Sequence, residues 1–117
     1  MSPETLFFEI ERTRRNWKLP QLCKQVERAA GEVLSAEMDG LFWTGAWVAG
    51  VEPAPDASLL QVVVVLARGA TVDDLPRAHA ELLRCAPRFR FAVASAIHRK
   101  RTPELAFHVL LPGGEPS

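Results

Sequence analysis

The sequence predicts an α+β domain in which helices pack against one three-stranded sheet. Apolar residues recur at helical spacing over residues 22–34 and again over residues 75–97. Residues 42–52 and 59–67 are rich in Trp, Val, Thr and Leu, as strands are, and residues 105–111 alternate as a third strand does. The predicted order is helix, strand, strand, helix, kink, helix, strand, after an N-terminal extension.

The first forty residues carry a start signal and a break signal for helices. Ser2-Pro3-Glu4 combines an N-cap residue with proline at the first helical position. Pro20 is expected to interrupt this helix, so that a second helix begins near it and ends at Asp39-Gly40. The chain therefore divides into a partly basic helical extension (1–19), one domain (20–111) and a loose Gly- and Pro-rich tail (112–117).

The helix after Pro20 and the second strand have the clearest apolar patterns. Helical spacing relates Leu22, Cys23, Val26, Ala30, Val33 and Leu34. Residues 59–66 hardly alternate, which favours a central strand with much of both faces covered. Prolines remove backbone donors from residues 52–58, which are therefore expected to form the loop of a hairpin.

The second helical region is expected to break in the middle. It opens at residues 71–74 with acids in its first turn, and its inner face is predicted to hold Leu75, Ala78, Leu82 and Leu83. Pro87 clashes with an upstream carbonyl in a continuous helix, so a kink is expected at residues 85–87. The following piece is predicted to turn Phe89, Val93, Ala96 and Ile97 inward.

Length and composition indicate one soluble globular domain. The chain has 117 residues, of which 48% are hydrophobic and 24% charged. Its longest apolar run, residues 62–67, is too short to cross a membrane as a helix, and no secretory signal opens the chain. Two cysteines make no disulfide framework, so a reduced, cytoplasmic protein is expected.

The net charge of zero conceals a segregation of charge along the chain. Residues 12–28 and 84–101 together hold 12 of the 14 bases and one of the 14 acids, a net charge of +11. The remaining positions carry −11. Since an electrostatic field follows the local charge distribution, two basic segments on one face would attract nucleic acid, whereas two solvated helix surfaces would not.

Two stretches resemble the ribosome-binding factor A (RbfA) family. Residues 50–58, leading into Leu60-Gln61-Val62-Val63-Val64, are similar to that family's first hairpin. Residues 99–107 are similar to its basic segment, its Pro-Glu-Leu motif and its final strand. Asp39-Gly40 falls where family members often have Asp-Pro, and Gln25-Val26-Glu27-Arg28 matches the preceding helix. The resemblance covers roughly residues 20–111.

The resemblance implies a type II KH-like fold, with helices on one face of a mixed three-stranded sheet. KH domains grip single-stranded RNA with a Gly-x-x-Gly loop. The RbfA family replaces that loop by an Ala-x-Gly kink, and here the position reads Cys85-Ala86-Pro87. The resemblance further implies binding to the small ribosomal subunit during assembly, as a non-catalytic factor in rRNA maturation.

Other chemistry-bearing residues favour structural roles. Cys23 and Cys85 lack neighbouring ligands at zinc spacing, and His79 and His108 belong to no triad pattern. No Gly-rich phosphate loop occurs. We therefore expect no enzyme activity, no metal, no cofactor and no small-molecule substrate.

The tryptophans leave two interpretations open. Trp43 and Trp47 would share one face of a strand, either packed beneath the helices or exposed as a platform for bases. Trp17 lies among bases and either stacks on a base or packs under the N-terminal helix.

The candidate RNA-binding residues come from both basic segments: Lys24, Arg28, Arg88, Arg90, His98, Arg99, Lys100 and Arg101, with Arg12, Arg14 and Arg15 in support. We expect them to contact phosphates rather than read bases. The expected partners are the small ribosomal subunit and its rRNA, with no membrane, and the expected state is a monomer. The alternative function is a protein-interaction module of the same fold, which docks a protein through its acidic or aromatic surface.

Overall fold

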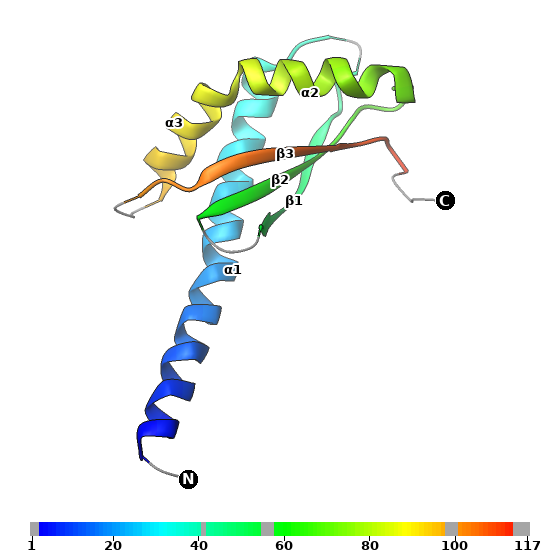
Figure 1. Ribbon diagram of the computed structural model, residues 1–117. Coiled ribbons are helices and arrows are strands. Elements are labelled where there is room, and N and C mark those ends of the chain that lie inside the picture. The colour runs from blue at the N-terminus through cyan, green and yellow to red at the C-terminus, as the bar shows by residue number, and fades with distance from the viewer. Residues whose placement is uncertain (1–2, 41, 55–57, 98–100, 114–117) are drawn as a thin grey trace.

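The computed structural model describes residues 3–40, 42–54, 58–97 and 101–113, with residues 3–18 described as helical backbone alone. It contains three α-helices, a short 3₁₀ helix and three strands (Figure 1). Their order is α1 (Pro3–Glu37), β1 (Trp47–Pro53), β2 (Leu59–Val65), η1 (Val72–Asp74), α2 (Leu75–Arg84), α3 (Ala86–Ala96) and β3 (Glu104–Leu110).

The three strands form one mixed sheet in the order β1-β2-β3. The hairpin β1–β2 is antiparallel, whereas β2 and β3 are parallel because α2 and α3 carry the chain back across the sheet. Val62 is the register partner of Val51 on one side and of Phe107 on the other. The sequence therefore predicted the number of strands, their order along the chain and the central place of β2.

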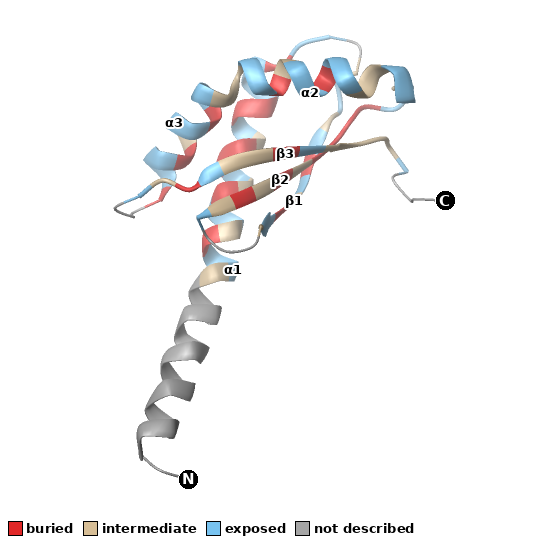
Figure 2. Ribbon diagram, viewed as in Figure 1, coloured by how far each residue is buried: buried red, intermediate tan, exposed pale blue. Residues whose placement is uncertain are grey.

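One face of the sheet carries the core. Along β2, Leu60, Val62 and Val64 are fully buried, while Gln61 and Val63 between them are half-buried. Helix α1 packs on β1 and α3, and α2 packs on β3 (Figures 1 and 2). This arrangement confirms the predicted α+β fold with helices on one face of the sheet.

The helices contribute the apolar side chains that the periodicity predicts. Val26 and Ala30 of α1, Leu82 of α2 and Val93 of α3 are fully buried. Phe89 of α3 meets Phe107 of β3 edge to face, with their ring centroids 5.1 Å apart. The core therefore links α3 directly to the edge strand of the sheet.

The predicted helix break at Pro20 is wrong. Helix α1 runs without interruption from Pro3 to Glu37, with Pro20 inside it. An interior proline removes one backbone hydrogen bond and crowds one carbonyl, which kinks a helix more readily than it ends one. Pro20 is exposed, and Leu22 and Val26, which come next on the same helix, are buried in the core. Packing of the next turns therefore outweighs the local penalty.

The predicted first strand is too long at its start, and its two tryptophans do not share a face. Trp43 lies in a turn and is 5% exposed, whereas Trp47 begins β1 and is 56% exposed. The backbone N–H groups of Trp43 and Thr44 both donate to the carbonyl of Gly40, which is helical-turn geometry. Gly45, with φ +94°, then redirects the chain into β1.

The predicted break at Pro87 is confirmed. Helix α2 ends at Arg84 and α3 begins at Ala86, with Cys85 between them at φ −91° and ψ 2°. Two predicted inward residues are wrong: Leu83 is 53% exposed and Ala96 is exposed. In α2 the buried residues are Ala78 and Leu82, and Leu83 lies next to them on the exposed side of the helix. In α3 the buried residues are Phe89 and Val93, and Ala96 likewise lies outside the buried face.

Candidate nucleic-acid interface

A surface groove runs between α1 and α3, and we call it the α1–α3 groove. Its first section has a volume of about 620 Å³ and is lined by Lys24, Gln25, Arg28, Ala29, Glu32, Phe91, Ala92, Ser95 and Ala96. A second section of about 470 Å³ adjoins it at Glu32, Phe91 and Ala92, and it reaches Val33, Ala36, Glu37, Pro87 and Arg88. The groove therefore joins the first basic segment to the start of the second.

Two bases from α1 stand at one end of the groove. Lys24 and Arg28 are both exposed and lie four residues apart, about 6 Å along the helix axis. Among the residues with described side chains, neither lies within 4 Å of a carboxylate. Their charges are therefore available to an anionic ligand, and successive phosphates of an extended strand have a comparable spacing.

Acidic side chains occupy the other end. Glu32 follows Arg28 by one helical turn and lines both sections. Further along, Arg88 of α3 donates to the carboxylate of Glu37 of α1, which partly neutralises a residue that the sequence predicts to bind RNA. The groove is therefore graded in charge, with free bases at the Lys24 end and a mixed pair at the Arg88 end.

Of the remaining candidate bases, the two whose side chains the structure describes, Arg90 and Arg101, do not line the groove. Arg90 lies on the flank of α3 that faces β3 and bonds to Glu104 at 3.3 Å, and it is not among the residues that line the groove. Arg101 is exposed just before β3. His98, Arg99 and Lys100 lie outside the described residues. The described bases are thus brought together only in part, with Lys24, Arg28 and Arg88 along one groove.

Phe91 is an aromatic groove residue that sequence reasoning missed. It is 76% exposed, more than any other large apolar side chain in the described ranges, and it lies where the two groove sections meet. A usable signal was present, because Phe91 follows the inward Phe89 by two residues, which on a helix is about 200° of rotation. The same periodicity that buries Phe89 therefore sends Phe91 to the surface.

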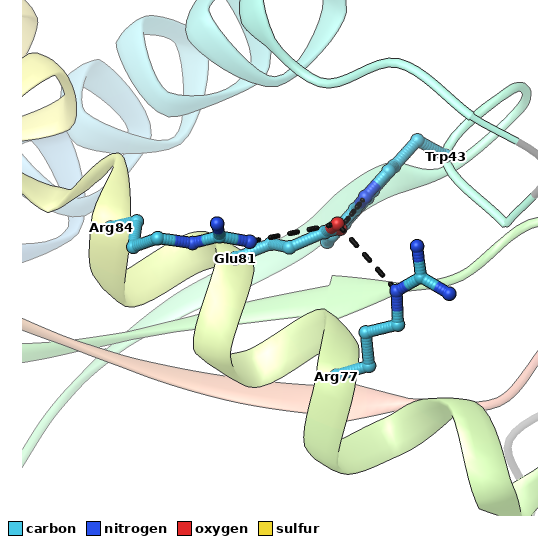
Figure 3. Close-up of polar contacts among 4 residues, drawn as sticks. All are labelled: Trp43, Arg77, Glu81 and Arg84. Carbon is cyan, nitrogen blue, oxygen red and sulfur yellow. Dashed lines mark hydrogen bonds and ion pairs between the residues drawn. The ribbon is translucent and has the colours of Figure 1, made fainter.

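Glu81 ties α2 to the turn before β1, and Figure 3 shows its partners. The indole N–H of Trp43 donates to the Glu81 carboxylate at 2.6 Å (Figure 3). Arg77 and Arg84 approach the other carboxylate oxygen at 3.9 and 3.8 Å, from two sides. Arg84, the first base of the second basic segment, is thus partly occupied by a structural contact.

No candidate metal site is found in the part of the chain that is described, and the Cys23 thiol is held in its protonated form. No group of three or more His, Cys, Asp and Glu residues there could hold a metal ion. Burial, and to a smaller extent the charge of Glu27, raises the pKa of the Cys23 thiol. No helix among the described residues is long and apolar enough to cross a membrane.

Comparison with known proteins finds solved structures that resemble this fold. Neither a protein-family model nor a curated protein matches the sequence. The crystal structure of ribosome-binding factor A from Thermus thermophilus matches with a TM-score of 0.63 and 28% identity, over 77% of this chain and 92% of that one. A Thermus thermophilus RbfA homology model, fitted into a cryo-EM map of a 30S–RbfA complex, matches with a TM-score of 0.59 and 28% identity. That match covers 74% of this chain and 88% of the other. Together with the KH-like arrangement of three helices on a mixed three-stranded sheet, these matches support an RbfA-like family for the chain.

Proposed function

We propose that the protein binds the small ribosomal subunit during assembly and contacts rRNA through the basic residues around α1 and α3. The observation that carries this proposal is the similarity to RbfA, one match being a model fitted into a 30S–RbfA complex. The role requires binding and no catalysis, and we expect the protein to act in the cytoplasm as a monomer.

The contacts we assign to RNA follow from the charges in and beside the α1–α3 groove. Lys24 and Arg28 bind phosphates directly, because no carboxylate among the described side chains lies within 4 Å of either of them. Arg88 and Arg90 contribute less, since each is already bonded to a carboxylate. The run from His98 to Arg101, which follows α3 in the sequence, supplies two or three further phosphate contacts.

The test is cosedimentation of the full chain with purified small subunits over a salt series. We expect binding that weakens steadily as salt rises, because phosphate contacts release counterions. Large ribosomal subunits serve as the control and should bind more weakly at every salt concentration. Equal binding to both subunits, or binding that salt does not weaken, would contradict the proposal. A salt-insensitive complex would instead favour a protein-interaction module.

A further inference from the structure

The α1–α3 groove combines free cations with an exposed aromatic ring on a floor of small side chains. Lys24 and Arg28 stand at one end, and Phe91 stands where the two sections meet. Ala29 and Ala92 line the groove between them, which leaves space for a flat group against the ring. A volume of about 620 Å³ lies in the range of sites that hold small organic ligands.

The exposure of Phe91 calls for a ligand of particular chemistry. The Phe91 ring, which is 76% exposed, contributes little to the stability of the fold, because Phe89 and Val93, two residues before and after it, already fill the core. Every nucleic-acid base presents a flat π-face that stacks on such a ring, irrespective of sequence. A protein partner would bury the ring against the apolar side chains of the second section, Val33, Ala36 and Pro87. A nucleotide would also use the charged side chains of the first section, Lys24, Arg28 and Glu32, and we therefore favour a nucleotide.

We infer that the α1–α3 groove holds one unpaired nucleotide of an RNA strand, with its base stacked on Phe91 and its flanking phosphates on Lys24 and Arg28. This inference rests on the proposed function and specifies it, since a paired helix cannot offer a base face to Phe91. The nucleotide therefore comes from a single-stranded or bulged segment, the usual target of specific RNA recognition.

Glu32 gives the site a preference among bases. Its carboxylate lines the groove beside Phe91 and has no ion-pair partner within 4 Å among the described side chains. A carboxylate accepts hydrogen bonds from base amino groups, and it repels phosphate. The strand is thus oriented with phosphates toward Arg28 and the base edge toward Glu32, so cytosine, adenine and guanine should bind better than uracil.

The experiment measures the affinity of the full chain for a short labelled single-stranded RNA and for a duplex of the same sequence. Phe91→Leu removes the ring and keeps an apolar side chain, while Phe91→Trp keeps a stacking surface. We expect Phe91→Leu to weaken single-strand binding by about tenfold, since stacking on one aromatic side chain contributes of this order. Phe91→Trp should retain parental affinity, and duplex binding should be the same for all three proteins. Because the side chain is exposed, neither substitution should change the melting temperature.

The outcomes separate this inference from the proposed function. If Phe91→Leu binds the single strand as tightly as the parent, or if the parent does not bind it, the stacking site is refuted. Either result refutes the stacking site even if the protein cosediments with small subunits. If Phe91→Leu loses subunit binding but keeps single-strand binding, the groove takes a protein and the inference is again refuted. If Phe91→Leu weakens single-strand binding but the parent does not cosediment, the site stands and the ribosomal role falls.

Discussion

Trp43 and Glu81 form the polar contact that links the turn after α1 to helix α2. Trp43 is 5% exposed, so its indole N–H must find an acceptor inside the protein, and Glu81 provides one at 2.6 Å. Arg77 and Arg84 approach the same carboxylate from solvent, with side chains that are 76% and 75% exposed. The indole contact is therefore expected to matter more for stability than the two ion pairs.

Replacing Trp43 by Phe should lower the free energy of unfolding by about 1–3 kcal/mol, because a packed ring shrinks and a half-buried carboxylate loses its donor. The matched control is Arg77→Ala, which removes a mostly exposed partner of the same carboxylate and should change stability by less than about 0.5 kcal/mol. Urea denaturation measures both. A larger loss for Arg77→Ala than for Trp43→Phe would show that the ion pairs hold the turn.

Cys23 should react slowly with alkylating reagents at neutral pH. Burial and Glu27 raise the pKa of its thiol, and the reactive species is the thiolate. We expect the single-thiol variant Cys85→Ser to be alkylated by iodoacetamide more slowly when native than in urea. Since the folded state favours the protonated thiol, stability should fall as pH rises above the unfolded thiol's pKa. A native rate equal to the rate in urea would contradict this account.

At the scale of elements, Pro20 and Pro87 differ in their effect on the helix: the helix continues through Pro20 but breaks just before Pro87. Pro20 lies inside the continuous helix α1, whereas Pro87 lies in the first turn of α3, just after the break. The difference comes from the packing partners of the residues downstream of each proline. Beyond Pro20 the helix continues along β1, while beyond Pro87 the chain must turn so that Phe89 reaches Phe107.

Replacing Pro20 by Ala should stabilise the protein by about 1–2 kcal/mol. The substitution restores a backbone hydrogen bond in a helix interior, and the greater freedom of the unfolded chain offsets part of the gain. Pro76→Ala is the control, since Pro76 lies in the first turn of α2, where proline is well tolerated. Equal and small effects at both positions would mean that the helix breaks at Pro20 after all.

Replacing Pro87 by Ala should change RNA affinity more than stability. Proline in a first helical turn removes no intrahelical bond, so the free energy of unfolding should move by less than about 1 kcal/mol. Pro87 also lines the groove, and its removal lets the α2–α3 junction straighten, which should weaken binding several-fold. Affinity is measured with the RNA used for Phe91. Unchanged RNA affinity together with a large loss of stability would show that Pro87 serves the fold rather than RNA binding.

The sequence predicted most of these elements because their signals are local. Strand-type composition located β2, alternation located β3, and period-3.6 patterns located the helices, to within one or two residues at most ends, while Pro87 marked the break. The errors at Pro20 and Trp43 share a cause. In each case a non-local interaction outweighed a local rule. At Pro20, packing of the following helical turns kept the helix continuous. At Trp43, the chain forms a turn that depends on Gly45 and on a distant acceptor, Glu81.

At the scale of the whole molecule, the charge segregation of the sequence is only partly a segregation in space. Lys24, Arg28 and Arg88 line one groove, but Arg90 turns toward β3 and Arg84 toward Glu81. Charge counts along a chain do not show which side of a helix each base occupies or which carboxylate meets it. Glu32 and Glu37 were missed in the candidate site for this reason, whereas Phe91 was missed although its spacing from Phe89 already placed it on the surface.

The most direct test of RNA binding through the α1–α3 groove compares two double variants of equal charge. Lys24→Ala with Arg28→Ala removes the free bases of the groove, and Arg68→Ala with Arg77→Ala removes the two bases that lie outside both basic segments. RNA affinity is titrated at several salt concentrations. The groove variant should lower the slope of log affinity against log salt by about 1.4 to 1.8, as two lost phosphate contacts require, while the control variant keeps the parental slope. Equal slopes for the two variants would show that RNA does not bind in the groove.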